Sequence, residues 1–168
     1  MSYSTRNLGN AFTWLGWIIG FFLLAVLFDN ILDSQINPNQ SVNTVQTGSH
    51  QEIVLKRNRH GHYLFNGLID DQVVTFLVDT GATTTSIPEH LSTELGLKKG
   101  YRFPVKTANG NSFAYSTTIK SLKLGKIEFN NVNASLNPGL QGYEILLGMD
   151  ILKNMELVQR GDTLILKK

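Results

Sequence analysis

The chain contains no cysteine among its 168 residues, and this absence excludes several chemistries at once. Disulfide bonds, zinc–thiolate sites and thiol catalysis all require that side chain. Charge is also scarce: 17% of the residues are charged, and the formal net charge is +2. Because a nucleic-acid-binding surface needs a basic field, we expect no nucleic-acid partner. The histidines lack the spacing of a metal site, so we expect neither a metal nor another cofactor: His50, His60, His62 and His90.

Residues 11–28 form a long apolar run without a single charged side chain. In a helix this run spans about 27 Å, close to the thickness of the hydrocarbon core of a bilayer. A core helix of a soluble protein would carry a polar face, and a cleaved signal peptide would be followed by a small-residue cleavage pattern that is missing after Phe28. Trp14 and Trp17 lie near one end, as indoles do at a membrane interface. We therefore predict an uncleaved transmembrane anchor.

The charges that flank this run predict its orientation. Arg6 precedes it, Asp29 and Asp33 follow it, and the next Lys or Arg is Lys56. The positive-inside rule then predicts that residues 1–10 are a cytoplasmic N-terminus and that everything after the anchor lies outside the cytoplasm.

Two further segments follow the anchor. Residues 29–51 are rich in Asn, Gln, Ser and Thr and nearly uncharged, which predicts a flexible linker. Residues 52–168 alternate short β-branched and aromatic runs with turn residues. Many short strands with regular turns predict one all-β domain, a small barrel or sandwich, with one or two short helices.

One turn of this domain has two candidate positions. Asp70 and Asp71 separate two strand-like runs, and Asn66 and Gly67 form the dipeptide that suits a type I′ hairpin turn. We predict the turn at Asp70 and Asp71, because it leaves two longer strands.

Helices are predicted at two places. Ser86 followed three residues later by Glu89 is a capping-box pattern, and Gly96 is a stop signal, so a helix is expected between them. Residues 150–155 are expected to form one or two further helical turns.

The candidate chemistry lies where the strand of residues 73–78 ends at Asp79, Thr80 and Gly81. A run of Val, Thr, Phe and Leu this short predicts a strand covered on both faces. An ionised carboxylate at the edge of a core is costly unless it is hydrogen bonded or paired, and glycine lets the backbone turn. The tripeptide by itself is an ordinary turn, but its position after an apolar strand makes Asp79 the candidate catalytic residue.

Three segments in this order make the chain resemble a retropepsin, the single-lobed aspartic peptidase. They are residues 76–82 around Asp79, the Thr-Ala-Asn-Gly hairpin of residues 107–110, and Ile-Leu-Leu-Gly-Met-Asp-Ile-Leu at residues 145–152. With its N-terminal anchor, the chain resembles a bacterial group of membrane-tethered retropepsin-like peptidases. The resemblance implies a small closed β-barrel. One departure is Asp150, where Ser or Gly is expected, and a helix N-cap is the simplest explanation.

Peptide hydrolysis by water needs a base that activates the water and an acid that protonates the carbonyl or the amine. Two carboxylates that share one proton can do both, but this sequence holds only one Asp-Thr-Gly. An enzyme of this class must therefore be a homodimer in which each chain contributes Asp79 across a two-fold axis.

The resemblance also implies roles for the residues around this acid. Thr80 would hydrogen bond across the axis, and Gly81 would present its N–H to the carboxylate. Ala82 stands where pepsin-like enzymes have Ser or Thr, so the charged dyad has one donor fewer, and we expect a higher working pH. A flap over a peptide bound as an added strand would be formed by Ala108, Asn109 and Gly110. The acid loop would be supported by Leu146, Leu147 and Gly148.

The sequence thus predicts an anchored, homodimeric aspartic endopeptidase of a bacterial inner membrane, with a periplasmic or extracytoplasmic peptidase domain and a protein or peptide substrate. Two other interpretations stay open: a module on the same fold that binds peptides without cleaving them, and a structural membrane-tethered β-domain. The intact Asp-Thr-Gly argues against a module that only binds peptides, because such a module has no need of a costly acid. A purely structural β-domain would not explain the flap-like hairpin.

Overall fold

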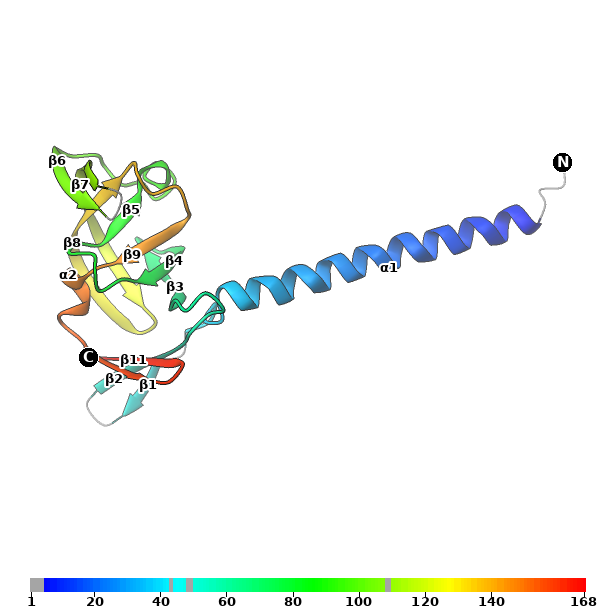
Figure 1. Cartoon of the computed structure of the whole chain (residues 1–168), viewed down its shortest axis with the longest axis horizontal. Coiled ribbons are helices and arrows are strands. Elements are labelled where there is room, and N and C mark those ends of the chain that lie inside the picture. Colours follow the sequence, from blue (N-terminus) through cyan, green and yellow to red (C-terminus); the bar gives the residue numbers. More distant parts are fainter. Residues whose placement is uncertain (1–4, 43, 48–49, 108–109) are drawn as a thin grey trace. The chain divides into compact units, whose positions relative to one another are not determined.

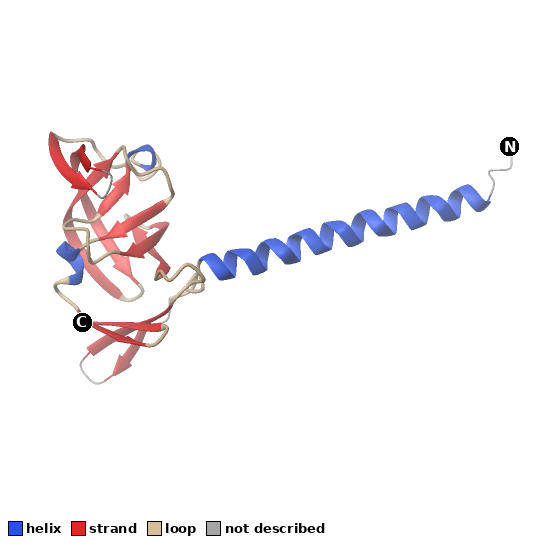
Figure 2. Ribbon diagram, in the orientation of Figure 1, coloured by secondary structure: helices blue, strands red, loops and turns tan. Residues whose placement is uncertain are grey.

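The computed structural model describes residues 5–42, 44–47, 50–107 and 110–168. The chain divides into two compact units, Met1–Gln35 and Ile36–Lys168. The described residues of the first unit form a single helix, and those of the second form mainly strands (Figures 1 and 2).

Helix α1 (Thr5–Ile36) carries the apolar run on its surface. Trp14, Trp17 and Phe21 are 70%, 64% and 68% exposed. The segment Phe12–Ile36 reaches a mean hydropathy of 2.1 and is long and apolar enough to cross a membrane. Length and composition of this kind are shared by membrane anchors and signal sequences.

The helix continues beyond the predicted anchor, residues 11–28, and ends at Ile36. Residues 29–36 contain neither glycine nor proline, so nothing in them interrupts the helical hydrogen bonds. Pro38 ends the helix, because its ring disfavours helical geometry at Asn37.

The segment after the helix is docked on the domain through asparagine side chains. Asn39 Nδ2 donates to the carbonyls of Lys56 (2.9 Å) and Leu64 (2.6 Å), and its Oδ1 accepts from Lys56 N–H at 2.8 Å. Asn37 Nδ2 donates to Asn66 Oδ1 at 2.8 Å, and both Asn37 and Asn39 are buried. The Asn39 amide supplies hydrogen-bond partners to backbone groups of Lys56 and Leu64 that would otherwise be buried without them.

The structure therefore differs from the predicted flexible linker of residues 29–51. Its first part is helical, its middle is docked, and strand β1 (Thr44–Thr47) pairs with the start of β2. Composition predicted the wrong structure because it cannot distinguish Asn, Ser and Thr side chains that face water from those that hydrogen bond to the backbone of a neighbouring strand.

Four strands form a terminal sheet in the order β1–β2–β11–β10. Besides β1, these strands are β2 (His50–Lys56), β10 (Glu156–Arg160) and β11 (Thr163–Lys167). The buried side chains Ile53, Leu55, Leu164 and Leu166 belong to the same apolar cluster as the rest of the domain, so this sheet packs on the common core.

The other seven strands form a barrel in the order β3–β4–β9–β5–β8–β7–β6, and a further pairing of β3 with β7 closes it. The predicted small closed β-barrel with short helices is confirmed. Strand β6 stays outside the closure as the free arm of the β6–β7 hairpin (Figure 1). The strand bounds are β3 (Leu64–Ile69), β4 (Gln72–Val78), β5 (Ser86–Pro88), β6 (Arg102–Thr107), β7 (Gly110–Leu124), β8 (Ile127–Asn137) and β9 (Glu144–Leu147).

The β3–β4 turn lies at Asp70 and Asp71, as predicted, with positive φ angles of 46° and 66°. The competing Asn66-Gly67 dipeptide lies inside β3 instead. A β-carbon on Gly67 would approach the Lys123 carbonyl to 2.6 Å, so this glycine serves strand packing rather than a turn.

The predicted helix between Ser86 and Gly96 is wrong. Ser86 belongs to strand β5, and only the short 3₁₀ helix η1 (Glu89–Leu91) follows, without a side-chain cap. Barrel pairing overrides the capping pattern: β5 pairs with β8 and β9, and Ile87 is fully buried. The second helix, α2 (Met149–Leu152), is shorter than predicted.

We predict that Asn39→Ala destabilises the domain. It removes three hydrogen bonds from buried or half-buried backbone groups, so we expect a loss of about 2–3 kcal/mol in the free energy of unfolding. The exposed neighbour Gln40 is a matched control, and Gln40→Ala should change stability by less than about 0.5 kcal/mol. Chemical denaturation of the full chain in a mild detergent measures both, and equal midpoints would contradict the docking role.

Candidate active site

Asp79 directly follows β4 and extends its pairing with β9 by one residue, because its N–H donates to the Leu147 carbonyl at 3.1 Å. The side chain is half-buried, and its Oδ1 accepts a hydrogen bond from Gly81 N–H at 2.9 Å. A β-carbon on Gly81 would lie 3.2 Å from that oxygen and crowd it. Ala82 N–H donates to the Asp79 carbonyl at 3.2 Å and closes the turn. The loop thus orients a carboxylate with its own backbone donor.

The tip of this loop is open in the single chain. Thr80 and Gly81 are exposed, and among the described residues no Lys, Arg or His forms an ion pair with Asp79. The site of one chain therefore offers one oriented carboxylate with accessible surface beside it.

The segment after β9 supports the acid loop through its backbone. Met149 N–H donates to the Ala82 carbonyl at 2.8 Å, and Asp150 N–H donates to the Thr83 carbonyl at 3.1 Å. Gly148 makes this approach possible.

A β-carbon on Gly148 would come within 2.5 Å of the backbone carbon of Thr84. No side chain fits there without separating the two segments, so the glycine is required by close backbone contact. Leu147 is fully buried beside it, in the core.

Asp150 ties the end of the acid loop to α2. Both of its carboxylate oxygens lie 3.0 Å from Thr85 N–H, and Oδ1 also accepts the Thr85 hydroxyl at 3.0 Å. Thr85 is fully buried. The expected N-cap role is wrong: Gly148 is the N-cap of α2, and no side chain caps it. Sequence reasoning missed this contact because the two residues are 65 positions apart.

The hairpin expected to act as a flap is β6–β7. Its tip residues Ala108 and Asn109 lie outside the described residues, and Gly110 begins β7 with a φ of 106°. The Arg102 guanidinium lies over the Phe113 ring at 3.5 Å and links the two strands away from the tip of the hairpin. Strand β7 pairs with β3, β6 and β8, and not with β4 or β9, the two strands that flank the acid loop.

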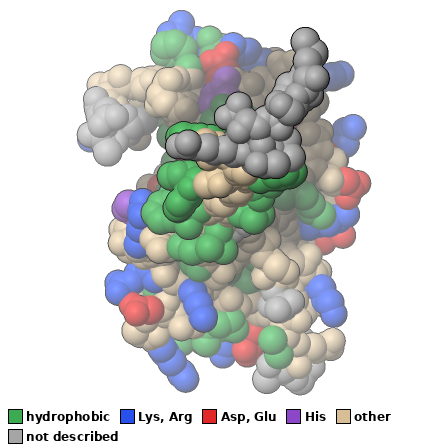
Figure 3. Space-filling model, turned by 90° about the vertical axis from the view of Figure 1, so that its right-hand side faces the viewer, with side chains coloured by type: hydrophobic (Ala, Val, Ile, Leu, Met, Phe, Trp, Pro, Cys, Tyr) green, Lys and Arg blue, Asp and Glu red, His purple; other side chains and the backbone are tan. Residues whose placement is uncertain are grey.

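Groups of three or more His, Cys, Asp or Glu side chains that could hold a metal ion do not occur in the part of the chain that the structure describes. On the face shown in Figure 3, acidic and basic side chains are interspersed, in keeping with the small net charge.

Comparison with known proteins places this geometry in a family. Residues 65–154 match the family described as "gag-polyprotein putative aspartyl protease". The crystal structure of a retropepsin-like aspartic protease from Rickettsia conorii is similar, with 30% sequence identity and a TM-score of 0.59. That match covers 76% of this chain and 95% of the Rickettsia chain.

Two curated relatives are uncharacterized proteins. One, from Sinorhizobium, is 28% identical over 83% of this chain, and the other, from Rickettsia prowazekii, is 31% identical over 62%. The chain spans 62% and 46% of the length of these two relatives. Because the family match covers more than half of the chain and includes the whole acid loop, the chain belongs to the gag-polyprotein aspartyl protease family and has a retropepsin-like fold.

Proposed function

We propose that the protein is a membrane-anchored aspartic endopeptidase that works as a homodimer. The observation that carries the proposal is the Asp79 carboxylate, oriented by Gly81 N–H on an exposed loop of a fold that belongs to a protease family. A domain that only bound peptides would gain nothing from holding an acid in this way.

One carboxylate cannot act as both acid and base in the same step, so the proposed site needs two. In a two-fold dimer each chain contributes Asp79, and the pair shares one proton. The ionised carboxylate takes a proton from water, the water oxygen attacks the peptide carbon, and the protonated carboxylate gives its proton to the carbonyl oxygen. Proton transfer to the amide nitrogen then lets the C–N bond break.

The exposed tip of the acid loop supports a dimer through this surface. Thr80 is exposed and next to the acid, where a two-fold contact brings the same residue of both chains together. We propose that its hydroxyl bonds across the axis. The β6–β7 hairpin, with residues 108–110 at its tip, would close over a peptide bound as an added strand.

We propose that α1 is an uncleaved anchor in a bacterial inner membrane. Its length, its exposed apolar surface and the interfacial tryptophans Trp14 and Trp17 support this role. Arg6 before the span and Asp33 after it favour a cytoplasmic N-terminus and a periplasmic catalytic domain. Two copies confined to one bilayer have a raised effective concentration, which favours the dimer.

Asp79→Asn should abolish peptide cleavage by the full-length protein in bilayers, with a loss of at least about a thousandfold. The amide can neither accept the proton from water nor share one with its partner. Asp71→Asn, on the exposed β3–β4 turn, is the matched control and should keep full activity. Cleavage of a mixed peptide library between pH 3 and 7 measures both, and an active Asp79→Asn would refute the aspartic mechanism.

Asp150→Ala should lower kcat more than it raises KM, because it frees Thr85 and loosens the loop that carries Asp79. We expect a kcat loss of about tenfold to a hundredfold. Asp150→Asn keeps one acceptor and should restore part of the rate. Asp162→Ala removes an exposed ion pair to Arg57 instead and should leave kcat unchanged. Steady-state kinetics on a soluble peptide would distinguish these results, and unchanged kcat in Asp150→Ala would contradict the positioning role.

Ala82→Ser should move the pH–rate profile to lower pH by roughly half a unit to one unit. A hydroxyl at this position adds a donor to the ionised dyad, which favours the charged form at lower pH. Ala82→Gly adds no donor and serves as the control. A profile that stays in place, or moves to higher pH, would show that residue 82 does not set the working range.

A further inference from the structure

Strands β4 and β9 present two different faces because their side chains alternate. They pair in parallel, with Phe76 opposite Ile145 and Leu77 opposite Leu146. Phe76 and Ile145 are fully buried in the core, whereas Leu77 and Leu146 are half-exposed on the other side of the sheet. The second face is therefore an apolar strip with access from outside.

Asp79 lies at one end of this strip. It follows Leu77 by two residues, and the hydrogen bond from its N–H to Leu147 continues the strand pairing as far as the acid. Side chains two apart on a strand share a face, so the Asp79 carboxylate and the Leu77 side chain point to the same side. In the proposed peptidase, a peptide bound at Asp79 would lie over this face.

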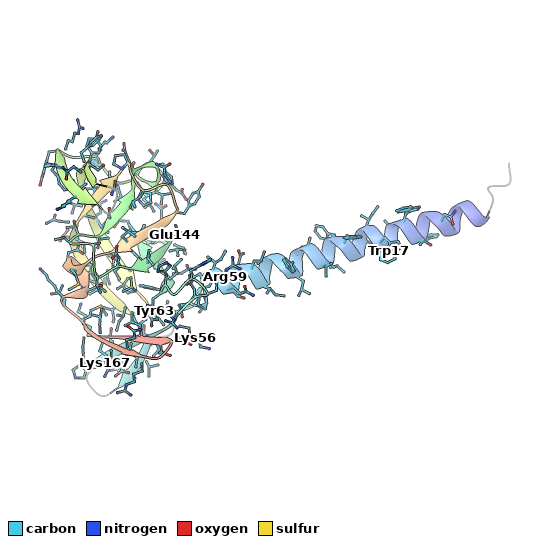
Figure 4. The ribbon with its side chains drawn as sticks, in the orientation of Figure 1. Trp17, Lys56, Arg59, Tyr63, Glu144 and Lys167 are labelled. Atoms are coloured by element: carbon cyan, nitrogen blue, oxygen red, sulfur yellow. The ribbon has the colours of Figure 1, made fainter. Side chains whose placement is uncertain are left out.

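Glu144 lies at the other end of the strip, at the start of β9, where it is opposite Thr75 (Figure 4). It precedes Leu146 by two residues and shares its face, about 7 Å further from the acid along the strand. The α-carbons of Asp79 and Glu144 are thus about four strand residues apart, or roughly 13 Å.

The Glu144 carboxylate is half-exposed and lies against the backbone of Gly142, where any β-carbon would clash with its Oε2. No Lys, Arg or His of the described residues forms an ion pair with it. An acid beside two leucines, without a cation of its own, is placed to receive a cation from a ligand.

The length and chemistry of the strip fit lysine and arginine. Their methylene stems can lie on apolar surface while the charged head reaches a carboxylate beyond it. A side chain next to the scissile bond would leave the peptide near Asp79 and cross Leu77 and Leu146. Only a long side chain would extend far enough to reach the carboxylate of Glu144.

We propose that Glu144 is a specificity-determining residue that selects a lysine or arginine side chain next to the scissile bond, with Leu77 and Leu146 as the apolar floor. This rests on the proposed peptidase function. In the two-fold dimer the feature occurs twice, once on each side of the cleaved bond, so the preferred substrates carry basic residues at either flanking position.

The test uses full-length protein in bilayers at pH 6 and matched peptides with lysine, norleucine or glutamate next to the cleaved bond. Norleucine keeps the apolar stem of lysine without its charge. We expect kcat/KM for lysine to exceed that for norleucine by about tenfold, near the low end of the coupling energies measured for close charge pairs, because Glu144 is half-exposed. Glu144→Gln should bring the ratio near one while norleucine cleavage is kept, and Glu144→Lys should favour glutamate.

Glu94→Gln, an exposed acid on a loop outside the strip, is the control and should keep the wild-type ratio. Equal cleavage of lysine and norleucine peptides by the wild type, or an unchanged ratio in Glu144→Gln, overturns the assignment of Glu144 while leaving the peptidase intact. Absence of any cleavage that depends on Asp79 overturns the proposed function, and the assignment of Glu144 with it.

Discussion

The contact between the acid loop and the segment after β9 is the constraint on which the site depends. Leu147, Met149 and Asp150 meet the loop in sequence, each through a backbone hydrogen bond, and the Asp150 carboxylate adds the contact to Thr85. Gly148 permits that approach by having no side chain. In the proposed dimer such support would keep the two Asp79 carboxylates within reach of each other, because a small displacement of either acid would separate the pair.

At the start of the domain, too, a side chain hydrogen bonds to the backbone of distant segments. Asn39 completes the hydrogen bonding of Lys56 and Leu64 much as another strand would. The terminal sheet then joins residues from both ends of the unit Ile36–Lys168 in one structure. The domain is therefore more than the residues of its barrel, and segments that look dispensable by composition contribute to its stability.

The barrel sheet also decides what surrounds the acid. Alternation along β4 and β9 sends Phe76 and Ile145 to the core and leaves Leu77, Leu146 and Glu144 on the side of Asp79. One register thus determines both the packing of the core and the side chains on the surface beside the acid. A shift by one residue would exchange the two faces and bury the acid.

Much of the protein was determined by local sequence. The apolar run of α1, the turn at Asp70 and Asp71, and the strand that ends in Asp-Thr-Gly follow from residues close together in the chain, whose alternation or backbone preference requires no distant partner. The predictions of a helix after Ser86 and of a flexible linker around Asn39 were wrong, because the side chains of these two residues hydrogen bond to distant segments. Such contacts across the fold outweigh the local preference of the sequence. The role of Asp150 was decided only by the tertiary structure, since its partner Thr85 lies 65 positions away and only the closed barrel brings them together.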